Sequence, residues 1–384
     1  MREVRSRSRR FGRLGAAAVA VAVVVTAAAC SKSGAGSPSS DAGNTSGGGS
    51  PAVSIQGDIT FNDANLAKLD AALKSALAGK DLSKLHEAMV VNVAVDYWNA
   101  GKTGFNKGLS DLGIKGTYQA PANGRLDQQL SIIQTLRGQG ITGLSVSAID
   151  PTAIKSPIAS ANGAGIPVLA IDSPLPKEDG AALYLGTPNY QAGQKAGEAM
   201  KQALGGKGQV VVLVGSLTTS NAVERIQGFE DALQGTSITV AQKVNDNLSA
   251  STATSDAETI LANNPDVTGL YGVYSYDGPA LAQAVTSAGK TASVHIVSDD
   301  SDAQTLQFIQ SGTISGTVVQ MPYQQGYTGA YILAAEKVLG KDATMALVKP
   351  YLAKDGSTLS SGVGLVTQSD LGAYQSLESQ LGIG

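Results

Sequence analysis

From Met89 onward, short apolar runs alternate with segments whose apolar residues recur at helical spacing, and this alternation constrains the fold most strongly. Helical patterns such as LDQQLSIIQTLRGQG and NAVERIQGFEDALQ separate the runs VVNVAV, GLSVSAI, PVLAI, QVVVLVG and SVHIVS. Runs that are apolar at consecutive positions suit strands that are buried on both faces, as in a parallel sheet covered by helices. The chain is therefore predicted to have a doubly wound α/β fold.

The number of strand-like runs indicates two lobes. About ten strands over roughly 290 residues exceed one compact sheet, so we predict two doubly wound α/β lobes joined by a multi-strand hinge. The predicted lobes comprise residues 89–186 plus 321–352 and residues 187–320 plus 353–384. The three crossings between them are expected near Gly186–Thr187, Gln320–Met321 and Tyr351–Lys354.

Residues 1–29 have the features of a signal peptide. MREVRSRSRRFGRLG carries six arginines against one glutamate, and the apolar run AAAVAVAVVVTAAA ends at Cys30. The run is shorter than the roughly 20 residues that span a bilayer. The stretch resembles a bacterial lipobox, with Ala27 where leucine is usual. The resemblance implies that Cys30, the only cysteine, is acylated and becomes the new N-terminus, and acyl chains would anchor the protein stably.

The residues after Cys30 predict a tether and an extension. Residues 30–56 are rich in Ser and Gly and are expected to form a flexible linker. Residues 57–88 show helical spacing of apolar residues and are expected to form a short helical extension. Residues 30–384 carry 22 basic and 30 acidic residues, a net charge of −8, so neither nucleic acid nor anionic lipid is an expected partner. The lipid would hold the exported protein on the outer face of the cytoplasmic membrane.

Polar residues recur where the predicted strands end. Ligands of open α/β sheets bind beyond the carboxyl ends of the strands. The residues at these ends include Asp96, Ser147, Asp150 and Asp172 in the first half, and Tyr274, Ser275, Tyr276, Asp277, Asp299, Asp300 and Gln320 in the second. One polar residue at a strand end often only caps the next helix. Recurrence in both halves predicts a polar cleft between the lobes.

These segments carry a resemblance to a known family. GLSVSAIDPTAI, AGIPVLAIDS, YLGTPNYQAGQKAGEAM, NAVERIQGFEDAL and SGTISGTVVQMPYQQGY together resemble the type I periplasmic sugar-binding proteins of ABC importers, the ribose-binding-like group. The resemblance runs from about Val90 to about Lys354. It implies two lobes that close by hinge motion around a sugar and hand it to a membrane permease.

The resemblance also implies a set of ligand-binding residues. By position, the set is Tyr97, Trp98, Ser147, Asp172, Asn221, Arg225, Tyr274, Asp277, Asp300 and Gln320. Ser147 and Tyr274 stand where the family often has asparagine, and Ser173 stands where it has arginine. Asp277 is a candidate to substitute at the Tyr274 position. These departures leave open which sugar, inositol or sugar alcohol is bound.

The residue types suit a neutral, hydroxyl-rich ligand. Aromatic rings such as Tyr97 and Trp98 offer rigid surfaces for the C–H faces of a sugar, although Trp98 is alternatively a core residue. Carboxylates accept hydroxyl protons, and a guanidinium donates to neighbouring oxygens. We therefore expect Arg225→Ala and Asp300→Ala each to abolish sugar binding while leaving the fold intact.

The sequence A-G-K-T at residues 100–103 raises the alternative of a phosphate-binding loop. That loop requires G-x-x-x-x-G-K-[ST], and Asp96 occupies its first glycine position. A carboxylate there would repel phosphate. We therefore predict that A-G-K-T does not bind phosphate. Separately, we expect no cofactor and no metal.

The predicted action is capture rather than catalysis by a monomeric binding protein with an ABC permease as its membrane partner. A secreted glycosidase is an alternative because Asp299 and Asp300 are paired acids, but adjacent residues seldom flank a bond from opposite sides. No G-x-S-x-G or H-E-x-x-H motif is present. A receptor that signals to a membrane kinase or chemoreceptor would have the same sequence pattern, so that alternative remains open.

Overall fold

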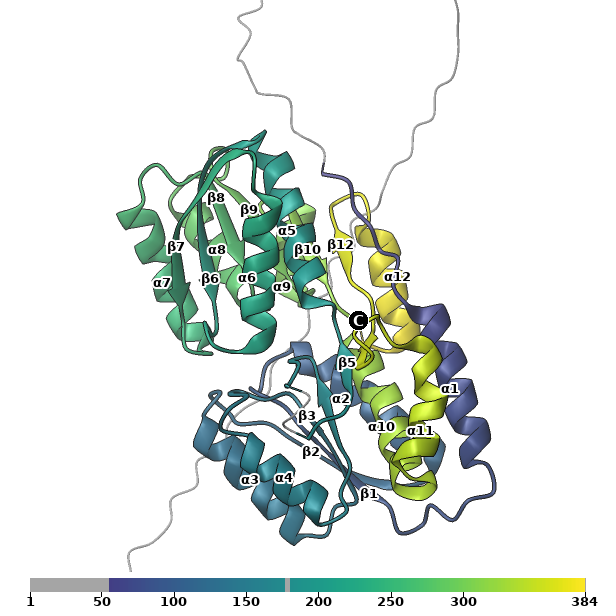
Figure 1. Ribbon diagram of the computed structural model, residues 1–384. Helices are drawn as coiled ribbons and strands as arrows, with labels where there is room; N and C mark the ends of the chain where they lie inside the picture. The colour runs from purple at the N-terminus through teal and green to yellow at the C-terminus, as the bar shows by residue number, and fades with distance from the viewer. Residues whose placement is uncertain (1–54, 177–179, 384) are drawn as a thin grey trace, which may run out of the picture. The chain divides into compact units, whose positions relative to one another are not determined.

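The computed structural model describes residues 55–176 and 180–383. Cys30, the signal peptide and nearly all of the predicted linker lie outside the described residues. The described chain contains two six-stranded sheets, each at the centre of one α/β lobe (Figure 1). The predicted fold class is therefore confirmed.

The first lobe is built on a sheet with the strand order β11-β5-β4-β3-β1-β2, in which every pairing is parallel. Its strands are β1 (His86–Val90), β2 (Lys115–Gln119), β3 (Gly143–Val146), β4 (Val168–Ile171), β5 (Tyr184–Gly186) and β11 (Thr358–Ser360). Its helices are α1 (Asp63–Leu77), α2 (Tyr97–Leu112), α3 (Leu126–Gly138), α4 (Lys155–Gly163), α10 (Pro322–Leu339), α11 (Lys341–Val348) and the short 3₁₀ helix η2 (Lys349–Tyr351).

The second lobe repeats this plan with the strand order β12-β10-β9-β8-β6-β7. Only β12, which pairs with β10, is antiparallel to its neighbour. The strands are β6 (Lys207–Val214), β7 (Ser237–Asn245), β8 (Gly269–Gly272), β9 (His295–Asp299), β10 (Gly316–Val319) and β12 (Gly364–Val366). The helices are α5 (Asn189–Leu204), α6 (Ser220–Ala232), α7 (Ala250–Asn263), α8 (Asp277–Ser287), α9 (Ala303–Ser311) and α12 (Leu371–Leu381).

Consecutive residues of the central strands pack into separate cores on the two faces of each sheet. In β1, Ala88 and Val90 join a core with Ile133 of α3, whereas Met89 joins the core that contains Phe105 of α2. The alternation follows from the two-residue period of a strand. The uninterrupted apolar runs of the sequence are therefore explained by helices on both faces, as predicted.

Within residues 55–176 and 180–383 the chain passes between the lobes three times, and the third crossing differs from the sequence-based prediction. The first two follow β5 and β10, at residues 187–188 and 320–321. Residues 358–360 form β11, which pairs with β5 of the first lobe, so the third crossing lies at residues 361–363 rather than 351–354. The strand consists of Thr-Leu-Ser, and a single apolar residue gives no recognisable run.

The N-terminal extension consists of one helix and a segment that contacts both lobes. Four leucines of α1 at helical spacing, of which Leu69 is fully buried, pack into the core of the first lobe. Upstream, Asp58 forms an antiparallel bridge with Leu365 of β12, and Lys195 Nζ of α5 lies 2.6 Å from its carboxylate. Residues 86–88, predicted as part of the extension, belong to β1. Within residues 55–176 and 180–383, no helix has the length and hydropathy to cross a membrane.

Candidate functional site

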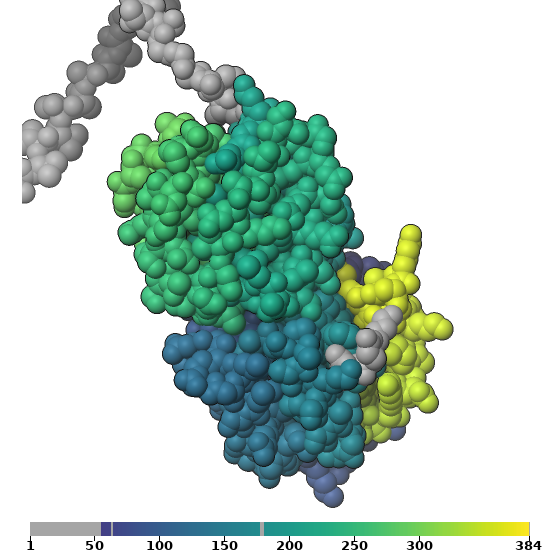
Figure 2. All heavy atoms as spheres, turned by 60° about the vertical axis from the view of Figure 1, so that its left-hand side comes forward, coloured from purple at the N-terminus to yellow at the C-terminus, as the bar shows by residue number. Residues whose placement is uncertain are grey.

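Loops at the carboxyl ends of strands from both lobes surround one small cavity. The lining residues are Asn92, Val93, Val95, Tyr97, Trp98, Asp172, Asn221, Arg225, Tyr274, Ser275, Tyr276, Asp300 and Gln320. Direct contacts join the lobes here: Asn221 Nδ2 donates to Asp172 Oδ2 at 3.1 Å, and Thr219 Oγ1 donates to the Ile149 carbonyl at 3.2 Å. On the face in Figure 2, the second lobe (green) touches the first (blue).

Arg225 is the central cation of the cavity and is almost fully enclosed. Its Nη1 lies 3.0 Å from Asp299 Oδ2, its Nη2 donates to Gln320 Oε1, and its Nε donates to Asn189 Oδ1. The side chains of Arg225 and Asp299 are only 2% and 0% exposed. Although burial alone would lower the pKa of Arg225, the neighbouring carboxylates raise it, so the guanidinium stays charged.

The position of Arg225 depends on close packing of two helices. A Cβ added at Gly193 of α5 would lie 1.9 Å from the carbonyl oxygen of Arg225 on α6. Only glycine permits this approach of the two backbones. The segment YLGTPNYQAGQKAGEAM therefore contributes to the site through Gly193 as well as through Asn189, which binds the guanidinium.

Two aspartates occupy equivalent places in the two lobes. Asp172 follows β4, the fourth strand of the first lobe, and Asp300 follows β9, the fourth strand of the second. Both have left-handed backbone conformations, with φ of 59° and 71°. Such conformations cost of order 1–3 kcal/mol in non-glycine residues and concentrate at functional sites. The strain is therefore a reason to assign both residues to a ligand site.

The two carboxylates are held by specific donors. Asp172 accepts hydrogen bonds from Ser147 Oγ, Tyr97 OH and Asn221 Nδ2, while Asp300 Oδ1 accepts from Gln320 Nε2 at 2.6 Å. Burial raises the pKa of Asp172 above its ordinary value and raises the pKa of Asp300 to about 7. Carboxylates outnumber cations around the cavity, which disfavours an anionic ligand such as a sugar phosphate.

The aromatic residues differ in how far they belong to the cavity. Tyr97 is half-buried and its hydroxyl reaches Asp172, whereas Trp98 is 1% exposed and donates from Nε1 to Asn92 Oδ1 at 2.9 Å. Trp98 therefore lines the cavity and is also part of the first lobe's core. In the second lobe, Tyr274 and Tyr276 meet edge to face at 6.2 Å between ring centroids.

Eight of the ten predicted ligand-binding residues line the cavity, and two do not. Ser147 is fully buried and instead orients Asp172. Asp277 is also fully buried, and its Oδ2 accepts a hydrogen bond from the Tyr274 backbone. Burial, reinforced by Asp246, raises the pKa of Asp277. The idea that Asp277 replaces a ligand-binding asparagine is therefore corrected: its position at the start of α8 turns it away from the cavity.

The set of ligand-binding residues predicted from the sequence omitted several residues that build the site. Tyr276 lines the cavity, and its hydroxyl donates to Asp246 at 3.0 Å. Asp299 pairs with Arg225, and Thr187 at the first crossing donates to Gln320 at the second. Their positions at strand ends were visible in the sequence, but which of several adjacent polar residues faces inward was not. Among the described residues, no cluster of three or more His, Cys, Asp or Glu forms a metal site.

The volume of the cavity shows that the lobes are closed upon each other. It is about 30 Å³, comparable to the space of one or two water molecules. A sugar ring does not fit into this space. The Asn221–Asp172 contact must therefore separate before a ligand of that size can enter.

The sequence model of the periplasmic binding protein domain matches residues 88–342. The chain belongs to this family. The family consists of binding proteins, in agreement with the prediction that the chain is not an enzyme, and it implies an extracytoplasmic location.

The chain is similar both to sugar- and polyol-binding proteins and to solved structures. The chain is 25% identical over 276 residues to the ribose import binding protein RbsB of Salmonella typhimurium, covering 72% of this chain and 92% of that protein. It is 29% identical over 201 residues to a xylitol-binding protein of Mycolicibacterium smegmatis, covering 52% and 57%. A solute binding protein of an ABC transporter from Burkholderia graminis, solved with D-arabinose, has a TM-score of 0.70, 27% identity, and coverage of 77% of this chain and 99% of that chain.

Proposed function

We propose that the protein captures a neutral sugar or polyol between its lobes and delivers it to an ABC-type membrane permease. One observation carries the proposal: Asp172 of the first lobe and Arg225 and Asp300 of the second converge on one cavity that Tyr97 also lines. Relatives that bind ribose and xylitol support the ligand class.

The chemistry of the cavity matches a hydroxyl-rich ligand. Asp172 and Asp300 accept hydroxyl protons from opposite lobes, and Arg225 and Asn221 donate to hydroxyl oxygens. Tyr97 offers a ring to the C–H face of a sugar. Since each lobe supplies one aspartate, full binding requires closure. After the contact of Asn221 with Asp172 separates to admit the ligand, the ligand would bridge the two side chains and hold the lobes closed.

Closure provides the signal for delivery. The three crossings at residues 187–188, 320–321 and 361–363 are the hinge, and Thr187 and Gln320 connect two of them by a hydrogen bond of 2.7 Å. Hinge closure changes the relative position of surfaces on the two lobes. The permease would recognise the closed arrangement. One chain supplies both halves of the site, so we propose that it acts as a monomer.

The binding proposal is tested by thermal unfolding and calorimetry with a panel of pentoses, hexoses, inositols and sugar alcohols. At least one compound should raise the melting temperature, because a ligand of the native state stabilises it. Asp172→Asn should lower the affinity for that compound by about 10- to 100-fold, which is the usual contribution of a hydrogen bond to a charged group. Asp127→Asn is the matched control, because Asp127 is exposed and pairs with Arg125 away from the cavity. The proposal fails if no compound in the panel binds.

We further propose that Cys30 carries the lipid that holds the protein on the outer face of the cytoplasmic membrane. Cys30→Ser should move the protein from the membrane fraction into the soluble exported fraction without changing its ligand affinity. Metabolic labelling with a fatty acid should label the wild-type chain but not Cys30→Ser. Equal membrane retention of both proteins would contradict the anchor while leaving the binding proposal untouched.

A further inference from the structure

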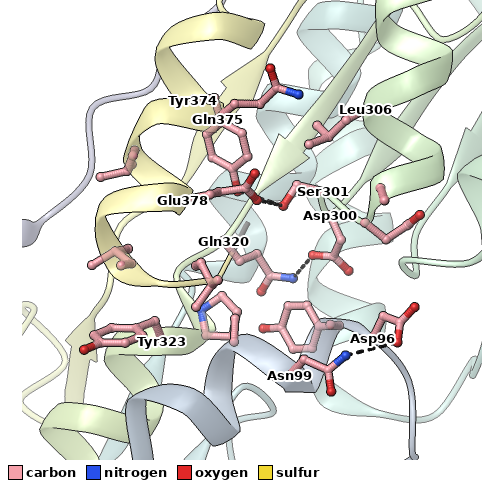
Figure 3. A pocket seen from close by; sticks show the side chains of 18 of the residues that line it. Asp96, Asn99, Asp300, Ser301, Leu306, Gln320, Tyr323, Tyr374, Gln375 and Glu378 are labelled. Carbon is pink, nitrogen blue, oxygen red and sulfur yellow. Dashed lines mark hydrogen bonds between the residues drawn. The ribbon is translucent and has the colours of Figure 1, made fainter. Parts of the chain in front are cut away.

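A second and much larger pocket lies beside the cavity. Its volume is about 740 Å³, within the range of about 300–1,000 Å³ that small-molecule sites occupy. It is formed by the start of α2, the loop from β9 to α9, the second crossing and one face of α12 (Figure 3). We call it the α12 groove.

The α12 groove is continuous with the cavity. Tyr97, Asp300 and Gln320 line both. In Figure 3, Asp300 and Gln320 lie between Ser301 and Glu378 on one side and Asp96 and Asn99 on the other. A ligand whose first ring contacts Asp300 would therefore lie directly beside the groove.

The lining of the α12 groove suits a second ring with hydroxyl groups. Carboxamides and carboxylates alternate there with apolar and aromatic side chains. The carboxamides and carboxylates that line the groove, beyond the shared Asp300 and Gln320, are Asn99, Gln307, Gln310, Gln375, Asp96, Asp302 and Glu378. Carboxamides both donate and accept, as hydroxyl groups do. None of the described lining residues is Lys, Arg or His, so the groove disfavours an anion.

The wall formed by α12 is held in place by a hydrogen-bond network. Ser301 Oγ lies 2.7 Å from Tyr374 OH and donates to Glu378 Oε1 at 3.1 Å. Tyr374 and Leu306 also share an apolar core. The helix is thereby fixed to the same loop that carries Asp300. The distance from Asp300 to the α12 wall is therefore fixed by these hydrogen bonds.

We propose that the α12 groove binds a second sugar unit, linked to the one held in the cavity, so that the ligand is a disaccharide or longer glycoside. This inference rests on the proposed function and deepens it, because it assigns the ligand's size. The second unit would contact Gln375 and Gln307 across the groove, with Tyr323 available to pack against its ring.

The test compares matched ligands on the full chain by calorimetry. D-xylose, D-glucose and D-galactose are each measured beside disaccharides that contain them, namely xylobiose, cellobiose and lactose. At least one disaccharide should bind at least 10-fold more tightly than its monosaccharide. Gln375→Trp, which fills the groove from an exposed position on α12, should remove that advantage while leaving monosaccharide affinity unchanged.

Gln380→Trp is the matched control, because Gln380 is exposed on the same helix but does not line the groove. It should change neither affinity. Monosaccharides that bind as tightly as their disaccharides would overturn the inference and leave the proposed function standing. A disaccharide advantage that survives in Gln375→Trp would also overturn it. If none of the six sugars binds, the inference fails, and the wider panel of the binding test decides whether the proposed function fails with it.

Discussion

Replacing Arg225 with leucine is expected to abolish ligand binding and also to destabilise the protein by about 3–5 kcal/mol. The substitution leaves Asp299, which is 0% exposed, without the guanidinium that lies 3.0 Å from it. Burial raises the pKa of Asp299 to about 8, so without its cation this carboxyl either stays charged and unpaired or binds a proton, and both leave a buried polar group without its partner. Urea unfolding of the two proteins at pH 7 measures the difference, and calorimetry with a ligand of the wild-type protein measures binding.

A double variant separates the two roles of Arg225. Arg225→Leu combined with Asp299→Leu removes both charges, and replacement of a buried ion pair by apolar side chains is often neutral or stabilising. The double variant should therefore recover most of the lost stability without recovering binding. Wild-type stability in the single variant would show that Asp299 does not depend on Arg225. Recovery of binding in the double variant would remove Arg225 from the site.

This expectation corrects the one drawn from the sequence, in which Arg225→Ala leaves the fold intact. In the sequence, Glu224 and Glu230 lie near Arg225 and offer local ion-pair partners as an alternative to its place in the ligand site. The structure instead shows that its partners come from α5, β9 and the second crossing. The periodicity of a helix shows which residues share its face, but it cannot show which distant strand ends meet that face.

The same limit explains which parts of the fold were predictable. Long apolar runs such as that of β6 have one physical explanation, burial on both faces, so the two sheets followed from the sequence. The three-residue strand β11 has only Leu359 to bury, and its assignment depends on pairing with β5. The third crossing was therefore displaced by about ten residues, while the crossings after β5 and β10 follow strands with clear apolar runs.

The sequence likewise predicted some features of the candidate site and not others. The residue types at the strand ends indicated a polar cleft, and eight of the predicted residues meet there. Asp277 was misassigned because it is the first residue of a helix, and a shift of one or two positions turns a side chain from the cavity to the protein interior. Positive φ at Asp172 and Asp300 has no sequence signal beyond the tolerance of aspartate for that conformation.

Replacing Asp300 with asparagine is expected to stabilise the unliganded protein at pH 8 and to weaken ligand binding by at least 10-fold. Burial raises the pKa of Asp300 from 3.8 to about 7, so ionisation of this side chain opposes folding. Asparagine keeps an oxygen to accept the hydrogen bond from Gln320 but carries no charge. The gain in the free energy of unfolding is at most about 4 kcal/mol, which is the energy equivalent of the pKa difference.

The pH dependence gives the effect a sign that can be checked. Well below pH 3.8, Asp300 is protonated in both the folded and the unfolded chain and has no effect. Between pH 4 and 7 the folded chain keeps a proton that the unfolded chain has released, so the free energy of unfolding falls as pH rises. Above pH 8 both forms are ionised and the cost is constant. The difference in stability between Asp300→Asn and wild type should therefore grow from pH 4 to 7 and then level off.

Thermal unfolding of both proteins at pH 4, 6 and 8 measures this difference, with ligand affinity measured at pH 8. Asp302→Asn is the matched control, because Asp302 is half-buried in the same loop and accepts backbone hydrogen bonds at the start of α9. Asparagine can still accept these backbone hydrogen bonds and caps helices about as well as aspartate, so this control should change stability little. An Asp300→Asn protein that is less stable than wild type at pH 8 would show that the ionised carboxylate is favourable in the folded state. The ionised Asp300 would then stabilise the fold, instead of opposing folding while it serves to bind the hydroxyl groups of a ligand.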